Sequence, residues 1–281
     1  MVREVVIDTE TTGFKAGDDK IVSITLLELE DLVPTGRHLS YYVNPGRPSS
    51  EGALKVHQLT EDFLNTQPKF SVVAHGLYDF LAKSTVVGHN VSFDLRFLAA
   101  EFDAAIGVRP CITSTCTLAL AREAKGQGDR GAGNKLDDLV QQFGITDLRA
   151  ATGQHGSFVD VLLTAQVYYA LRTGGLDRRI LDAIAKFVKE ELDVDLGHQS
   201  PRRTGLPTPA KADAALVPSD IRDLSGRDRQ NLQRPAGVHH ADEAGRAKPG
   251  STTPGNSPGG GRSHVDRVSE TLRAMILAGL K

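Results

Sequence analysis

Apolar residues gather in three short runs near the start of the chain, and turn-forming residues separate them. The runs cover residues 5–7, 21–29 and about 38–43, and they are rich in β-branched side chains. Gly17-Asp18-Asp19 follows the first run, and Asn44-Pro45-Gly46 follows the third. The pattern predicts that the chain opens with a three-stranded meander.

Farther along, the apolar spacing changes to that of amphipathic helices. Helices are predicted from Thr60-Glu61-Asp62 onward and over residues 71–83, 92–102, 117–124, 136–143, 157–171 and 176–192, with short strands at 86–87 and near Ile112. Strands first, followed by strand and helix alternation, are typical of an α/β fold in which a mixed sheet carries helices on its faces.

The composition changes after Gly197. Residues 197–262 hold 8 Pro and 10 Gly but only 7 Leu, Ile, Val and Phe, too few apolar side chains to offset the entropy of ordering the segment. Residues 263–281 return to a helical spacing, beginning at Ser263. We therefore expect a main domain over 1–175, an appended amphipathic helix over 176–196, a disordered Pro/Gly-rich linker over 197–262 and a C-terminal amphipathic helix over 263–281.

Charge and hydropathy exclude several classes of protein. Residues 197–262 carry 10 Lys and Arg against 6 Asp and Glu, so the net charge of −2 combines an acidic body with a mildly basic tail. Such a body does not bind nucleic acid by bulk charge. No apolar run approaches the roughly 18 residues of a membrane span, and no room is left for a signal peptide, so we expect a cytoplasmic protein without membrane contact. The two cysteines, Cys111 and Cys116, are expected to be free thiols.

An acidic pair follows the first apolar run, at Asp8 and Glu10. In a strand, side chains two residues apart share a face, so these carboxylates point the same way and repel one another. A divalent cation offsets this repulsion, and hard oxygen ligands suit Mg²⁺ or Mn²⁺. An ordinary acidic turn is the alternative for the pair alone.

Two further acids and one histidine extend the pattern. Asp94 lies in His89-Asn90-x-x-Phe93-Asp94 and Asp160 in His155-x-x-x-x-Asp160, each in the first turn of a predicted helix, where the helix dipole also favours an acid. With Asp8-x-Glu10-Thr-Thr-Gly, these motifs resemble, in order and spacing, those of the DEDDh 3'-to-5' exonucleases, a group that includes the proofreading epsilon subunit of bacterial DNA polymerase III, ribonuclease T and oligoribonuclease. The likeness runs from about residue 3 to 172.

The resemblance implies a ribonuclease H-like fold with a five-stranded mixed sheet flanked by helices. It also implies two bound divalent cations, Mg²⁺ or Mn²⁺, with Asp8, Glu10, Asp94 and Asp160 as ligands and His155 as the general base. Metals about 4 Å apart activate a water and stabilise the leaving oxygen of a phosphodiester, and an imidazole titrating near neutrality accepts the proton of the attacking water. The expected product is a nucleoside 5'-monophosphate.

The same comparison indicates which residues hold the 3'-terminal nucleotide. Thr11, Thr12 and Gly13 lie beside the metal ligands and are candidates to grip the sugar, and Phe14 either stacks on the last base or packs in the core. His57 is a candidate phosphate or sugar contact, although Gln58 follows it where glycine is common. Asn90 and Phe93 either shape the pocket or fix the loop before Asp94.

The leading function is a metal-dependent exonuclease acting on single-stranded DNA or frayed 3' ends. An RNA-trimming enzyme is an alternative, because the motifs do not distinguish the sugars. A third hypothesis makes the chain a tethering module whose C-terminal helix binds a polymerase or another protein.

Overall fold

The computed structural model describes residues 3–125, 133–152, 156–194, 196 and 202–203. All of them belong to one compact unit, residues 1–216. Within this described part, no helix is long and apolar enough to cross a membrane, and the two cysteines are unpaired, as the sequence predicts. The predicted linker and C-terminal helix lie outside the described residues, and the domain boundaries stay predictions.

A five-stranded mixed sheet forms the centre of the unit, in the order β3-β2-β1-β4-β5. Its strands are β1 (Glu4–Thr11), β2 (Ile21–Glu30), β3 (Val33–Tyr42), β4 (Thr85–Gly88) and β5 (Thr113–Cys116). The meander β1 to β3 is antiparallel, whereas β4 and β5 run parallel to β1. The expected mixed sheet is confirmed, and the fold is ribonuclease H-like.

Strand β1 extends beyond its parallel neighbour. It pairs with β2 along its whole length, but its pairing with β4 covers only Glu4–Val6. Strand β4 ends at Gly88, where a Cβ atom would lie 2.9 Å from a methyl carbon of Val91. The missing side chain lets the chain turn closely there, and Asn90 continues the turn with φ 63°. The second half of β1 is thereby left beside the start of the next helix instead of a strand.

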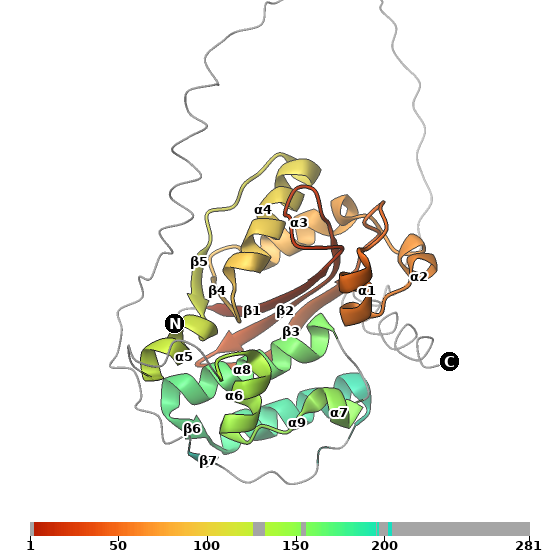
Figure 1. Ribbon diagram of the computed structural model, residues 1–281. Helices are drawn as coiled ribbons and strands as arrows, with labels where there is room; N and C mark the ends of the chain where they lie inside the picture. Colours follow the sequence, from red (N-terminus) through yellow and green to blue (C-terminus); the bar gives the residue numbers. More distant parts are fainter. Residues whose placement is uncertain (1–2, 126–132, 153–155, 195, 197–201, 204–281) are drawn as a thin grey trace, which may run out of the picture. The chain divides into compact units, whose positions relative to one another are not determined.

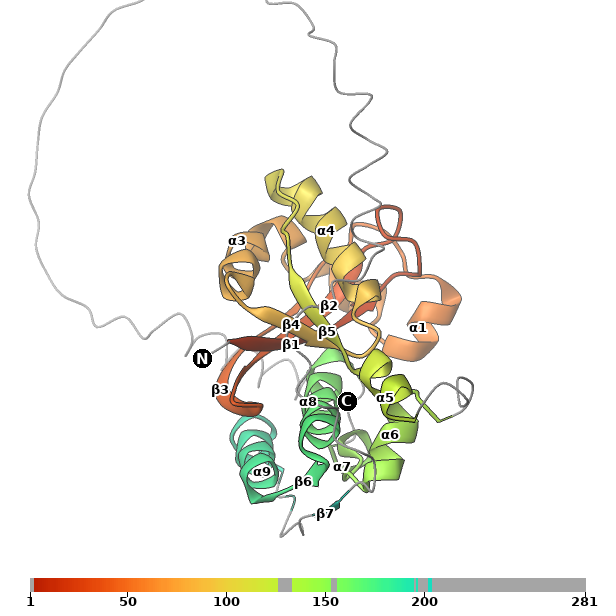
Figure 2. The same ribbon diagram turned by 90° about the vertical axis from the view of Figure 1, so that its left-hand side faces the viewer.

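Helices cover both faces of the sheet (Figures 1 and 2). Helices α3 (Phe70–Leu81) and α4 (Ser92–Ile106) lie on one face, where their apolar side chains join Val5 and Ile7 of β1 in a buried core. Helices α8 (Ser157–Thr173) and α9 (Arg178–Leu192) pack on the other face. Helices α5 (Thr117–Lys125) and α6 (Leu136–Phe143) pack against or beside α8. Successive side chains of a strand point to opposite faces of the sheet. Because Val5 and Ile7 face α3 and α4, the even-numbered residues of β1 face α8.

Several predicted bounds differ from the structure. Strand β3 starts at Val33, five residues before the predicted strand, because a tight turn at Asp31 and Leu32, both with positive φ, joins it to β2. Two short helices were not predicted: α1 (Glu51–His57), which Ser50 caps through its hydroxyl, and α7 (Leu148–Thr152). Helix α2 (Glu61–Asn65) begins as predicted after Thr60, but it has only 5 residues. Two-residue strands β6 (Gly175–Leu176) and β7 (Arg202–Arg203) form a separate small sheet.

Candidate active site

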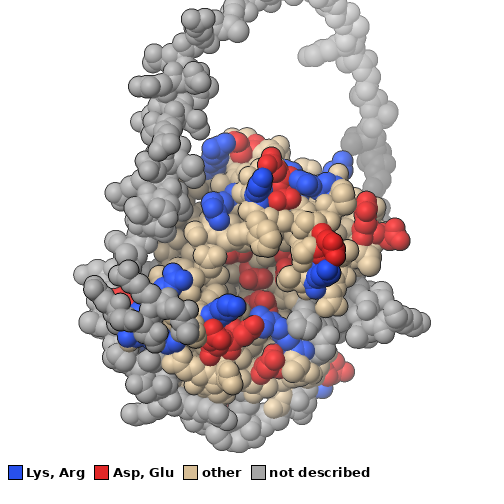
Figure 3. All heavy atoms as spheres, viewed as in Figure 1, with Lys and Arg blue, Asp and Glu red and all other residues tan. Residues whose placement is uncertain are grey.

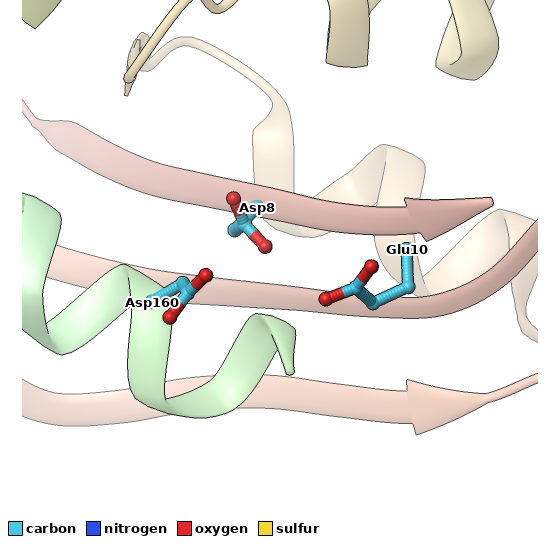
Figure 4. Close-up of side chains that lie close together, drawn as sticks. All are labelled: Asp8, Glu10 and Asp160. Atoms are coloured by element: carbon cyan, nitrogen blue, oxygen red, sulfur yellow. The ribbon is translucent and has the colours of Figure 1, made fainter. Parts of the chain in front are cut away.

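Three of the predicted metal ligands converge on one point. Asp8 and Glu10 project from β1 toward helix α8, which carries Asp160 in its first turn (Figure 4). One carboxylate oxygen from each of the three lies within 4.8 Å of the others. The alternation of β1 accounts for the shared face of the first two, and the packing of α8 on that face brings the third to them.

Asp94 reaches the site from the other side of β1. It lies in the first turn of α4, is 5% exposed, and its Oδ1 accepts a hydrogen bond of 2.7 Å from the Thr9 hydroxyl. Thr9 stands between Asp8 and Glu10 on the strand and points to the α4 face, beside the turn that follows β4. Asp94 is outside the group of three whose oxygens lie within 4.8 Å, but its charge still acts on Asp8 and Glu10.

Burial, and for Asp8 and Glu10 also mutual repulsion, raises the pKa values of Asp8, Glu10 and Asp94. Burial raises the pKa of Asp8 well above its usual range, and the charges of Asp160, Asp94 and Glu10 raise it further. The pKa of Glu10 rises to about 7, chiefly through burial and then through Asp160 and Asp94. Burial also raises the pKa of Asp94 to about 7, against the hydrogen bond from Thr9. The cluster therefore holds negative charge at neutral pH only at a free-energy cost.

Arg149 was not singled out by the sequence, and it is part of the site. Its Nε donates a hydrogen bond of 2.7 Å to Oδ1 of Asp160, and its Nη1 pairs with Asp137 of α6. The guanidinium lowers the pKa of both Asp8 and Glu10. Asp147, whose carboxylate accepts the Arg149 backbone N–H at 3.0 Å, begins the short helix that carries it. The signal available in the sequence was Asp147, which directly precedes the first residue of this short helix.

The segment after β1 is held by side chains rather than by regular structure. The Thr11 hydroxyl donates to the carbonyl of Gly13 at 2.6 Å, and the Thr12 hydroxyl contacts Asp19. Gly13 lies so close to Asp19 that an added Cβ would stand 2.5 Å from its carboxylate oxygen. Phe14 is 78% exposed, so its alternative role as a core residue is wrong. The loop thus presents an aromatic ring to solvent at the end of the strand that carries the acids.

His57 is buried at the end of α1. Its Nε2 lies 3.1 Å from the Ser49 hydroxyl, and its Nδ1 accepts the backbone N–H of Leu59 at 3.0 Å. Burial lowers the pKa of His57, which favours the neutral ring. Both ring nitrogens have protein partners, so His57 orders the loop around it. Gln58 occupies a position where glycine is common in the DEDDh exonucleases. It adopts a left-handed conformation with φ 56°.

Asn90 and Phe93 fix the loop before Asp94. The Asn90 carbonyl accepts the Phe93 backbone N–H at 2.9 Å, which closes the turn into α4. The Phe93 ring packs against Phe97, with 4.9 Å between the ring centroids. His155 lies outside the described residues, directly before Gly156 and α8.

Buried hydroxyl groups hold the start of α8 on the sheet. The Ser157 Oγ lies 2.7 Å from the Ser23 Oγ and 2.9 Å from the Thr25 Oγ1, and Thr25 in turn contacts Ser40 at 2.9 Å. Thr25 is the cross-strand partner of Asp8. The cluster therefore connects the strand region beside Asp8 to the helix turn that presents Asp160.

The donor set suits a divalent cation. Figure 3 shows acidic side chains at the bottom of a hollow in the middle of this face, with basic side chains on either side of it. Close carboxylate oxygens that repel one another are hard ligands of the kind that Mg²⁺ and Mn²⁺ prefer. Asp8, Glu10 and Asp160 could hold such an ion with little rearrangement.

Comparison with known proteins gives a consistent result. The family model described as "Exonuclease" matches residues 5–168. The DNA polymerase III subunit epsilon of Rickettsia prowazekii (strain Madrid E) is 35% identical over 179 residues, which cover 62% of this chain and 75% of the relative. The subunit of the same name from Buchnera aphidicola subsp. Acyrthosiphon pisum is 33% identical over 189 residues, covering 64% and 76%.

Solved structures share the fold. The zinc-bound exonuclease I–single-stranded DNA complex of E. coli aligns with a TM-score of 0.56 at 17% identity, over 65% of this chain. This chain spans only 42% of the exonuclease I chain, so the likeness concerns the fold alone. The family match covers more than half of the sequence and contains Asp8, Glu10, Asp94, His155 and Asp160. The chain therefore belongs to the exonuclease family and is a 3'-to-5' exonuclease, a hydrolase of phosphodiester bonds.

Proposed function

We propose that the protein removes nucleotides from the 3' end of DNA in proofreading or repair and releases nucleoside 5'-monophosphates. The convergence of Asp8, Glu10 and Asp160 to within 4.8 Å carries the proposal, because it creates a site for metal-assisted phosphodiester hydrolysis. The choice of DNA is supported by relatives named DNA polymerase III subunit epsilon and by fold neighbours solved with single-stranded DNA.

Asp8, Glu10, Asp94 and Asp160 are proposed to hold two divalent cations, Mg²⁺ or Mn²⁺, with Asp8 shared between them. When bound, the cations would lower the pKa of an attacking water and neutralise charge on the leaving oxygen. Thr9 keeps Asp94 in place through its 2.7 Å hydrogen bond. The raised pKa values of Asp8, Glu10 and Asp94 support the assignment, because a bound cation favours the ionised form that burial disfavours in all three and that repulsion also disfavours in Asp8 and Glu10.

His155 is proposed as the general base that accepts the proton of the attacking water. The residue precedes the first residue of α8 by two positions and Asp160 by five, so it is close to this ligand in the sequence. An imidazole with a pKa near 6.5 is largely neutral at physiological pH and able to accept a proton.

The 3'-terminal nucleotide is proposed to lie against the loop that follows β1. Phe14 offers an exposed ring for stacking on the terminal base. Thr11, Thr12 and Gly13 form a constrained backbone beside the acids that suits contact with the sugar. His57, Asn90 and Phe93 are proposed to support this pocket by ordering its walls.

A hydrolysis assay on 3'-labelled and 5'-labelled oligonucleotides tests the proposal. Mg²⁺ or Mn²⁺ should support stepwise shortening from the 3' end with 5'-monophosphate products, and excess chelator should stop it. His155→Ala should lower the rate by about 10²-fold or more, the scale of general base catalysis. Cleavage that persists in chelator would exclude the metal assignment.

Comparing single-stranded DNA with RNA of the same sequence separates the leading function from the RNA-trimming alternative, and faster RNA shortening would reject the DNA assignment. The tethering hypothesis is tested by deleting residues 204–281, which keeps all described elements. We expect unchanged hydrolysis of short oligonucleotides and loss of binding to a polymerase subunit. Loss of hydrolysis would place part of the catalytic machinery in the tail.

A further inference from the structure

Arg149 brings a positive charge into the acidic site at the place where a metal ion is expected. Its side chain is 18% exposed, as is that of Asp160, and Nε lies 2.7 Å from Asp160 Oδ1. The opposite end of the guanidinium pairs with Asp137, whose side chain is 72% exposed. The fork of Arg149 therefore joins a ligand carboxylate of α8 to a solvent-facing carboxylate of α6.

The contact is built by the fold. Helix α7 presents Arg149, and its start is ordered by Asp147, which accepts the Arg149 N–H. Asp137 lies in the first turn of α6, and α6 packs against α8. Three separate elements thus set the position of one guanidinium, whose several N–H donors let it bond two different carboxylates at once.

The position has an electrostatic consequence for the other ligands. Among the described residues, Arg149 is the cation that counters the repulsion felt by both Asp8 and Glu10. A divalent cation bound by Asp8, Glu10 and Asp160 would lie close to a fixed like charge. It would also compete with Nε for the oxygen Oδ1 of Asp160.

We propose that Arg149 is an internal counter-cation of the metal site. It holds Oδ1 of Asp160 while the site is free of metal, keeps the carboxylates together, and lowers the affinity for divalent cations. It is a positioning residue rather than a catalytic one. The inference rests on the proposed metal-dependent function and adds a residue that sets the metal affinity of that site.

Calorimetric titration of the full chain with Mn²⁺ at low ionic strength tests the inference. Arg149→Met keeps the length of the side chain but removes its charge, and we expect Mn²⁺ to bind at least about tenfold more tightly, because a fixed like charge nearby is gone. Arg149→Lys retains the charge and should bind Mn²⁺ nearly as the unaltered protein does. In chelator, Arg149→Met should melt below the unaltered protein, since the carboxylates lose their counter-cation.

Arg109 provides a matched control, since its Nη2 pairs with Asp103 at the same 2.7 Å at the far end of α4. Arg109→Met should leave Mn²⁺ affinity unchanged. If the unaltered protein binds no Mn²⁺, the proposed function fails as a whole. If it binds Mn²⁺ but Arg149→Met binds equally or more weakly, the proposed function stands and the counter-cation role is wrong.

Asp137→Asn decides the question if Arg149→Met does not fold. This substitution leaves the Arg149 charge in place and removes the exposed carboxylate that partly neutralises it. Mn²⁺ should then bind several-fold more weakly, which is the opposite sign from Arg149→Met. Unchanged or tighter binding by Asp137→Asn would overturn the proposal.

Discussion

Individual residues of the site are arranged for ligand binding at the expense of stability. Asp8 illustrates this, because burial and three neighbouring carboxylates all oppose its ionisation. A buried group under such repulsion destabilises the metal-free fold at neutral pH, whereas an amide of the same size would not carry this charge. Function and stability therefore make opposite demands at this position.

Asp8→Asn should separate these demands. Removing one like charge is expected to raise the free energy of unfolding in chelator at pH 7.5 by at least about 1 kcal/mol, since one pKa unit corresponds to about 1.4 kcal/mol. Hydrolysis should fall by more than about 100-fold, because even outer partners of metal ligands are worth 10–100-fold. Thermal denaturation and a 3'-end assay measure the two effects, with exposed Asp79 of α3 (Asp79→Asn) as the control. A variant less stable than the parent in chelator would contradict the repulsion argument.

Gln58 carries backbone strain beside His57. It ends α1 with φ 56° and ψ 14°, and its N–H donates to the carbonyl of Leu54 at 2.8 Å. Glycine adopts this left-handed conformation without a Cβ penalty, so Gln58→Gly should raise the free energy of unfolding by about 0.5–1 kcal/mol. Urea denaturation measures it. Gln141→Gly, within helix α6, is the matched control and should be destabilising by about 1 kcal/mol. Equal effects of the two substitutions would show that the conformation of Gln58 carries no strain.

At the scale of elements, apolar periodicity predicted the features that depend on burial. The strands at Ile21 and Val86 and the helix at residues 136–143 follow directly from it, because β2 and β4 are buried on both faces and α6 buries one side. The short helices α1 and α7 were missed, because 7 and 5 residues are too few to show the helical periodicity of apolar side chains. The acids of the site were predicted from motif spacing. Arg149 was not predicted, because an arginine outside any motif can be assigned to the site only once the packing of the helices places it beside Asp160.

The cluster of buried hydroxyl groups around Ser157 fixes the position of α8 on the sheet. Ser157→Ala would leave the buried Ser23 hydroxyl without its partner at 2.7 Å, and we expect destabilisation by about 1–3 kcal/mol. The first turn of α8 should also become less fixed, so Mn²⁺ affinity should fall with it. Thr164, on the same helix, has a buried hydroxyl without a hydrogen-bond partner. Thr164→Val should therefore leave stability unchanged or raise it, and Mn²⁺ affinity should stay as it is. Equal losses in both variants would mean that α8 responds to any substitution.

At the scale of the whole molecule, the acidic cluster proposed as the catalytic centre lies on a sheet whose apolar core does not depend on it. The core of β1, α3 and α4 is apolar, and it lies on the face opposite to the one from which Asp8 and Glu10 project toward α8 (Figure 4). Charge in the site should therefore change the stability of the unit without changing its fold. Because several carboxyls titrate together, the effect should be visible in a global property.

Stability in chelator should fall as pH rises. Glu10 and Asp94 have pKa values of about 7 in the folded protein, against roughly 4 in the unfolded chain. Between these values the folded state binds more protons, so stability decreases through this window and is lowest above pH 7. We expect the melting temperature to drop by roughly 5 °C between pH 5.5 and pH 8. Saturating Mg²⁺ should reduce the drop, and so should Asp94→Asn. A melting temperature in chelator that rises over this range would exclude the assignment of the two carboxyls.

The unequal lengths of β1 and β4 have a dynamic consequence. Only the first part of β1, Glu4–Val6, is flanked by strands on both sides, whereas Asp8 to Thr11 pair with β2 alone. In deuterium exchange, amides of the first part should open only with global unfolding, and those of the second part through smaller fluctuations. The same strand would then have a rigid first part and a more flexible second part. Bound nucleotide should slow exchange in the second part alone.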